Sequence, residues 1–201
     1  ELLSKYHEGL IVASACLGGE IPQAIMKGKI EEAEKAILEY KEIFGEDFYL
    51  ELQRHKTGIP ERDKDIYDWQ KIVNKEIVSL ADKHNIKYIA TNDVHFLNKD
   101  DYDAHDILIC LNTGRDKDDP TRMKYTGREY FTSQEEMNEL FSDLPKAIEN
   151  TQEIVDKVVE YDINSKPIMP VFHIPEEFED ADDYLRHITY EGAKERWTDI
   201  T

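Results

Sequence analysis

The chain has 201 residues, of which 40% are hydrophobic and 34% are charged. This composition suits one globular domain, or one and a half small ones, and argues against intrinsic disorder. The 25 basic and 44 acidic residues give a net charge of −19, which repels phosphate backbones and argues against non-specific nucleic-acid binding by this chain alone. No run approaches the ~18 apolar residues of a membrane-spanning helix. The two cysteines lie far apart in the sequence and suggest no disulfide framework, so we expect the protein to be located in the reducing cytoplasm.

Both ends of the sequence suggest a piece cut from a longer protein. The first residue is Glu1 rather than Met, and the last amphipathic stretch, residues 182–197, has apolar positions that need a partner surface. A complete small protein with a processed start is the alternative.

The first half of the chain alternates strand and helix patterns. The apolar run 10–17, closed by two glycines, predicts a strand buried on both faces. Apolar residues at helical spacing predict helices over 30–44 and about 62–84. The segments 48–53 and 88–96 predict the second and third strands. This order indicates βαβ units and a parallel sheet or barrel.

The second half is expected to be mainly helical. A helix is predicted over 102–111 before Gly114, and a charged loop follows over 115–128. Ser133 and Glu136 form a capping-box pattern, and Pro145 suits the first turn of a further helix. Three prolines then predict extended chain over 162–177. We therefore expect an α/β domain over 1–161, and a linker with the start of a next domain over 162–201.

Asp93 and His95 are the sharpest candidates for chemistry. They come at the end of the third predicted strand, where alternation would point both to one face with Cβ atoms about 7 Å apart. A carboxylate and an imidazole at that spacing can share a metal ion, and catalytic groups of parallel barrels gather at strand carboxyl ends. The alternative is an Asp that caps the next helix beside a structural His.

Cys16 is a second candidate, at the end of the first predicted strand and hence on the same rim. A thiolate favours zinc, but a buried free cysteine also behaves as a small hydrophobe. Glu51 and His55 come from the end of the second predicted strand and could face the same rim, although His55 could equally be a loop histidine. Cys110 is predicted to lie in the core, and His105 to pack or cap on its helix.

Three segments carry a resemblance to a known family. The segments GLIVASACLGGEI over 9–21, FYLELQ over 48–53 and ATNDVHFL over 90–97 resemble, in order and spacing, the PHP (polymerase and histidinol phosphatase) domain of the alpha subunit of bacterial DNA polymerase III. The resemblance continues through 105–106, 133–137 and 150–151, and residues 184–192 are similar to the segment leading toward the polymerase palm. It covers essentially the whole chain.

The resemblance implies a partial distorted (β/α) barrel of the PHP type, followed by a mainly helical segment. It implies that Cys16, Asp93 and His95 are metal ligands for zinc, manganese or magnesium, and it assigns no catalytic residue within this chain. The family's opening His-x-His motif and its middle His and Glu ligands would precede Glu1. We expect the metal-binding atoms of the three residues to lie within about 8 Å of one another, as a shared ion or a dinuclear cluster requires.

Three functions remain open at this point. The first is part of a DNA-directed DNA polymerase whose metal cluster hydrolyses phosphodiesters, with the polymerase carboxylates beyond Thr201. The second is a catalytically silent scaffold that docks a proofreading exonuclease subunit. The third is a free-standing metal-dependent phosphoesterase. The resemblance implies the rest of the polymerase chain and other replisome subunits as partners, with DNA bound through the whole protein and no membrane.

Overall fold

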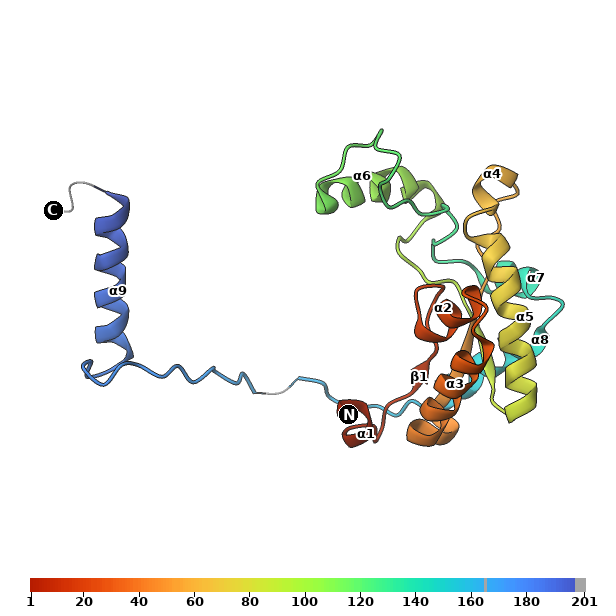
Figure 1. The fold of residues 1–201 in the computed structure, drawn as a ribbon, viewed down its shortest axis with the longest axis horizontal. Helices are drawn as coiled ribbons and strands as arrows, with labels where there is room; N and C mark the ends of the chain where they lie inside the picture. The colour runs from red at the N-terminus through yellow and green to blue at the C-terminus, as the bar shows by residue number, and fades with distance from the viewer. Residues whose placement is uncertain (165, 198–201) are drawn as a thin grey trace. The chain divides into compact units, whose positions relative to one another are not determined.

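The computed structural model describes residues 1–164 and 166–197 (Figure 1). The chain divides into two compact units, Glu1–Val159 and Glu160–Thr201, and each is described here by itself. Among the described residues, none of the helices combines the length and the apolar character needed to cross a membrane.

The first unit is built on three parallel strands in the order β1-β2-β3. Their bounds are Val12–Ala13 for β1, Phe48–Gln53 for β2 and Tyr88–Thr91 for β3. Helix α3 (Ile30–Phe44) connects β1 to β2, and α5 (Tyr67–His84) connects β2 to β3. The predicted βαβ units and parallel sheet are thereby confirmed, and the sheet of the described residues is open.

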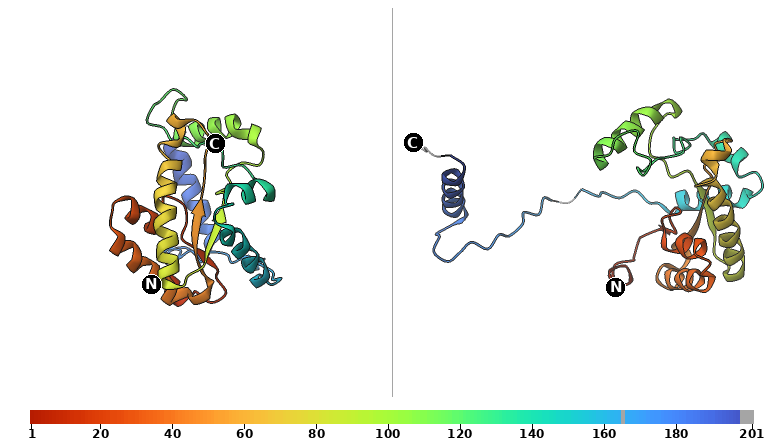
Figure 2. Two further views of the ribbon diagram at one scale, coloured as in Figure 1. Left: turned by 90° about the vertical axis from the view of Figure 1, so that its right-hand side faces the viewer. Right: turned by 45° about the horizontal axis from the view of Figure 1, so that its top comes forward.

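Alternation along β2 separates an apolar face of the sheet from a partly polar one. Leu50 and Leu52 are fully buried in the main core, with helices α3 and α5. Leu50 pairs with Tyr88 and Leu52 pairs with Ala90. Tyr88 and Ala90 of β3 therefore point into the same core as the two leucines. The opposite face carries Tyr49, Glu51, Gln53 and Thr91, and α8 (Pro145–Lys157) lies against β3. In Figure 2 (left), α5 and α8 lie on opposite sides of the strands.

The other helices are short, apart from α6 and α9. Their bounds are α1 Leu2–Lys5, α2 Glu20–Met26, α4 Pro60–Asp63, α6 Tyr102–Thr113, α7 Gln134–Leu140 and α9 Ala181–Arg196, and two 3-10 helices, η1 and η2, cover Gly45–Asp47 and Lys99–Asp101. The predicted capping box is confirmed, because the Ser133 hydroxyl accepts from the Glu136 N–H and the Glu136 carboxylate accepts from the Ser133 N–H. Pro145 is the first residue of α8, as predicted.

Two predicted strands are shorter than expected. The first covers only Val12–Ala13, which are half-buried and exposed, so the expectation of a strand buried on both faces is wrong. It ends because Ala15 has a φ of 65° and the chain turns there. The third strand stops at Thr91 rather than at residue 96 because Asp93 has a φ of 44°. Ala15 directly precedes the candidate ligand Cys16, and Asp93 is itself a candidate ligand.

Two helical predictions also need correction. The helix expected over 62–84 is split into α4 and α5, because the backbone of Ile66, with a φ of −122°, departs from helical geometry between them. Cys110 is half-buried rather than in the core, because Asp106 is the buried residue of α6 and the apolar side chains around Cys110 face outward.

The second unit contains an extended segment and α9. Residues 160–164 and 166–175 form neither helix nor strand, as expected for a segment with three prolines; Ser165 lies outside the described residues. Helix α9 begins after Asp180, whose side chain accepts from the Asp183 N–H at 2.8 Å, and the ring of Phe178 lies 4.9 Å from that of Tyr184. The polymerase carboxylates expected beyond Thr201 lie outside the described residues, as do residues 198–201.

Candidate metal centre

The candidate site lies at the carboxyl ends of the three strands. Because the strands are parallel, the segments that follow β1, β2 and β3 all emerge at one end of the sheet. These segments carry Cys16 after β1, His55 after β2, and Asp93 with His95 after β3. Helices α4 and α6 follow at the same end (Figure 1).

A tight turn fixes Cys16. The Ser14 N–H donates to the Tyr49 carbonyl at 3.1 Å, and the Ser14 hydroxyl accepts from the Glu51 N–H at 2.9 Å. The Gly19 N–H then closes the turn on the Cys16 carbonyl at 2.8 Å. A Cβ at Gly19 would lie 2.6 Å from the Ser14 carbonyl oxygen, so only glycine fits there.

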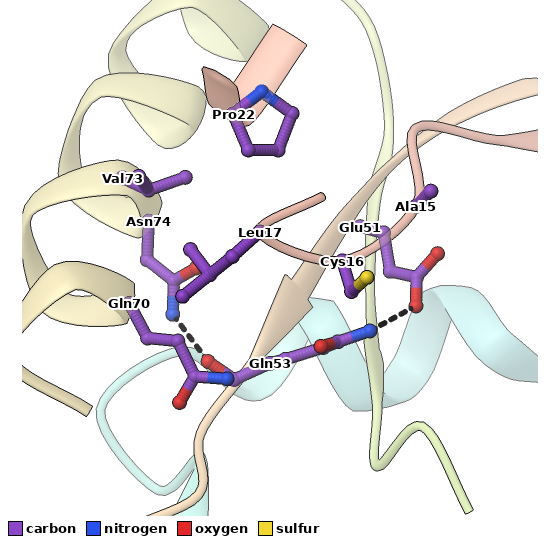
Figure 3. Close-up of a pocket in the computed structure, with 9 residues that line it drawn as sticks. All are labelled: Ala15, Cys16, Leu17, Pro22, Glu51, Gln53, Gln70, Val73 and Asn74. Atoms are coloured by element: carbon purple, nitrogen blue, oxygen red, sulfur yellow. Dashed lines mark hydrogen bonds between the residues drawn. The ribbon is translucent and has the colours of Figure 1, made fainter. Parts of the chain in front are cut away.

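Cys16 lines a small cavity with residues of β2 and α5 (Figure 3). The cavity has a volume of about 10 Å³, roughly the space of one water molecule. Glu51 lines it too, with a carboxylate that accepts from the Gln53 amide at 2.7 Å and from the Thr91 hydroxyl. Glu51 and Cys16 therefore share this polar end of the sheet, and one Glu51 oxygen is held by neighbours on the sheet itself.

Asp93 and His95 lie together despite the early end of β3. The Asp93 Oδ1 and His95 Nε2 atoms are 3.4 Å apart, and the side chains of Asp93 and His95 are 36% and 33% exposed. The alternation argument was wrong in its premise, because residues 92–95 form no strand. The left-handed backbone of Asp93, a conformation that Asp tolerates better than most residues, turns its carboxylate to the imidazole instead.

Aromatic rings surround His95. The ring centroids of His95 and Tyr125 are 4.4 Å apart, and His105 lies 6.0 Å from His95 and 5.0 Å from Tyr125. Burial raises the pKa of the Tyr125 phenol, and the nearby Asp93 carboxylate raises it further. The predicted packing role of His105 fits its place against Phe96, at 5.2 Å.

His55 lies beneath this surface rather than on it. Its side chain is buried, with 4% of the residue exposed, and the Nε2 atom donates to the Asn92 carbonyl at 3.0 Å. His55 therefore supports the segment that carries Asp93 and does not itself reach the open rim.

Sequence reasoning missed the loop over 115–131 that completes this neighbourhood. Tyr125 and Glu129 belong to it, and a buried ion pair anchors it, with Arg122 donating to both Asp106 oxygens at 2.6 and 2.8 Å. The hydrogen bond from Arg122 lowers the pKa of the Asp106 carboxyl group. No hydrophobic period marks the loop, so only long-range pairing places it here.

The donors present suit a divalent metal ion in type but do not form a complete set. A thiolate, a carboxylate and an imidazole are ligands that zinc accepts. Within residues 1–164 and 166–197, however, no three His, Cys, Asp or Glu side chains are grouped closely enough to hold one ion. The structure pairs Asp93 with His95 and places Cys16 on a separate strand end.

Comparisons with known proteins support the family resemblance. The family model described as "PHP domain" matches residues 1–55. The chain is 45% identical over 201 residues to the DNA polymerase III subunit alpha of Borreliella burgdorferi. This match covers 99% of the chain and 17% of the relative. It is 40% identical over 198 residues to that of Pseudomonas fluorescens, covering 98% of the chain and 16% of the relative. The corresponding protein of Treponema pallidum is 34% identical over 203 residues, covering 100% and 16%.

The chain thus spans about a sixth of the length of the relatives it matches. The chain is therefore homologous to one region of the DNA polymerase III alpha subunits, and this region includes part of their PHP domain.

Proposed function

We propose that this chain is part of a replicative DNA-directed DNA polymerase, in which it supplies a portion of a metal-binding PHP domain. The observation that carries the proposal is the similarity over 98–100% of the chain to alpha subunits from three organisms. Residues 1–161 form part of the PHP domain, and residues 162–201 are the linker and the start of the palm-proximal domain. The whole protein acts in the cytoplasm, on DNA and with other replisome subunits.

In this proposal the open sheet is one part of a distorted (β/α) barrel. The outer edges of β1 and β3 carry no further strand among the described residues, so the sheet can be extended on either side. The further ligands of a metal ion held by Cys16, Asp93 and His95 then come from additional strands whose carboxyl ends lie at the same end of the sheet. This accounts for a donor set that is right in type and incomplete in number.

Cys16, Asp93 and His95 would hold a zinc or manganese ion in the completed domain. A metal ion bound there would polarise a phosphodiester and lower the pKa of a bound water. Two of the three residues, Cys16 and His95, are held by their surroundings. The turn closed by Gly19 fixes Cys16, and the ring of Tyr125 packs against the imidazole of His95.

A scaffold role that docks a proofreading exonuclease subunit is the second candidate. The observation that favours it is the exposed apolar side of α6, where Ile107, Leu108 and Leu111 are 55%, 54% and 75% exposed. Together with the net charge of −19, this surface suits contact with protein rather than with DNA.

The test uses the complete polypeptide that contains this sequence. We expect template-dependent primer extension by the purified polypeptide, and bound zinc or manganese that elemental analysis detects. Replacing Cys16→Ser or His95→Ala should lower the metal content while extension persists. The absence of extension would refute the polymerase assignment, and an unchanged metal content in both variants would refute the metal site.

A further inference from the structure

We propose that two buried side chains, His55 and Glu129, are positioning residues that set the geometry of Asp93 and His95 for metal binding. This inference rests on the metal site proposed above. His55 and Glu129 are 4% and 2% exposed, so neither reaches an ion on the open rim. The His55 side chain is hydrogen-bonded to the segment 92–96 directly, whereas the Glu129 carboxylate fixes the loop whose backbone carbonyl is hydrogen-bonded to that segment.

His55 holds the segment from its amino-terminal side. The His55 N–H donates to the Gln70 side-chain carbonyl at 2.7 Å, which orients the Gln70 amide so that its NH₂ group donates to His55 Nδ1 at 3.0 Å. The Nδ1 atom is therefore the acceptor and Nε2 carries the proton, which it donates to the Asn92 carbonyl at 3.0 Å. Gln70 thus selects the tautomer that fixes the residue just before Asp93.

Glu129 holds the segment from its carboxyl-terminal side. Its carboxylate accepts from the backbone N–H groups of Thr126, Gly127 and Arg128 at 3.0, 2.9 and 3.0 Å, and from the Thr126 hydroxyl at 2.8 Å. The loop is thereby wrapped around one buried anion. The Glu129 carbonyl then accepts from the His95 N–H at 2.8 Å, so the loop fixes the backbone of the candidate ligand.

Asn92 joins the two supports. Its side-chain amide donates to the Arg128 and Tyr130 carbonyls, both at 2.8 Å, while its own carbonyl is held by His55. Asp93 directly follows Asn92, and its φ of 44° is a conformation that persists only where the surroundings impose it.

The pair His55 and Glu129 acts through hydrogen bonds rather than as an ion pair. His55 Nδ1 and Glu129 Oε1 are 3.7 Å apart, but Nδ1 already accepts from Gln70 and carries no proton to share. The two residues therefore make separate contributions to the segment. A buried carboxylate without a cationic partner is costly unless its hydrogen bonds are complete, so this loop closes only when Glu129 is fully satisfied.

The experiment measures zinc affinity by competition with a chromogenic chelator, on the complete polypeptide and with magnesium in excess to fill weaker oxygen-ligand sites. We expect Glu129→Gln to weaken zinc binding by about 10- to 100-fold, because its NH₂ group would face backbone N–H donors. His55→Ala should act in the same direction. His55→Gln should restore the affinity to within a few-fold of the unmodified protein, because its amide can still donate to Asn92.

Controls separate positioning from loss of folding. Glu153→Gln removes another multiply bonded carboxylate, on α8, and should lower the urea midpoint without changing zinc affinity. In a His95→Ala background, Glu129→Gln should weaken residual zinc binding much less than it does alone, since coupled residues are not additive. If Glu129→Gln does not fold, the comparison of His55→Ala with His55→Gln decides.

The outcomes distinguish this inference from the proposed function. If His95→Ala leaves zinc affinity unchanged, the metal site itself is wrong. If His95→Ala weakens zinc binding but Glu129→Gln and His55→Ala both stay within about two-fold of the unmodified protein, the site stands and the positioning role is wrong. Equal losses in His55→Ala and His55→Gln would also refute it, because the hydrogen bond to Asn92 would then not matter.

Discussion

Glu153 on α8 should make the stability of the first unit depend on acid pH. Its carboxylate accepts from Lys87 Nζ at 2.5 Å and from the Tyr49 hydroxyl at 2.7 Å, and it also pairs with Lys157 Nζ at 3.3 Å. The hydrogen bond from Lys87, followed by that from Tyr49, lowers the pKa of Glu153 from 4.5 to about 2. These bonds tie α8 to β2 and to the start of β3.

The size of the effect follows from the pKa. A folded-state value of about 2 against 4.5 corresponds to roughly 3 kcal/mol. The side chains of Lys87 and Glu153 are 43% and 30% exposed, so solvent screening reduces the contribution to about 1–2 kcal/mol. Because the folded pKa is depressed, this stability is fully present above pH 4.5 and is lost as the pH falls toward 2.

The assay is urea unfolding of the unmodified chain and of Glu153→Gln, followed by circular dichroism between pH 7 and pH 3. We expect Glu153→Gln to be less stable by about 1–2 kcal/mol at pH 7 and the two proteins to converge as the pH falls. Asp156→Asn, an exposed carboxylate on the same helix, is the matched control and should change little. A difference that stays constant from pH 7 to pH 3 would refute the reasoning.

Further predictions concern the core, a helix cap and the surface charge. Leu52 is fully buried on β2, so the Leu52→Ala variant should have a free energy of unfolding that is lower by about 2–5 kcal/mol. A decrease below ~1 kcal/mol in urea unfolding would contradict the packing described. Ser133→Ala should cost about 0.5–2 kcal/mol and Ser133→Asp much less, because only alanine removes the cap of α7; equal losses would exclude capping as the cause. The chain with its net charge of −19 should bind duplex DNA weakly or not at all at ~150 mM salt, and sub-micromolar binding in a fluorescence titration would overturn this expectation.

The regular elements were predictable because their signals are local. The apolar spacing over 30–44 and the segment 48–53 predict α3 and β2 with the bounds observed, since burial of one stripe or one face decides those residues. The ends of β1 and β3 were not predictable in the same way. They depend on left-handed backbone at Ala15 and Asp93, and neither residue is glycine, the residue that most clearly marks such a position in a sequence.

The candidate site was predictable only in its ligand-type residues. Asp93 and His95 stand out because both donors lie two positions apart at a strand end, and the structure brings them to 3.4 Å. The supporting residues give no such signal. The Glu129 carbonyl accepts from the His95 N–H, but Glu129 lies in a loop without hydrophobic periodicity. The donors to its carboxylate are backbone N–H groups, which nearly every residue has. Only the tertiary structure therefore identifies Glu129 as a neighbour of His95.

The left-handed conformation of Ala15 sets thermal stability against precise placement of the neighbouring Cys16 thiol. A side chain with a Cβ atom loses about 1–2 kcal/mol of folding free energy in the left-handed region, and Ala15→Gly would remove this cost. Glycine in turn costs about 0.5–1 kcal/mol, because its unfolded chain has more conformational entropy. A variant library ranked by melting temperature alone would therefore tolerate or enrich Ala15→Gly. Glycine would also allow the turn beside Cys16 to adopt other backbone conformations. Such a library would therefore enrich variants that have a higher melting temperature but a less fixed Cys16 thiol.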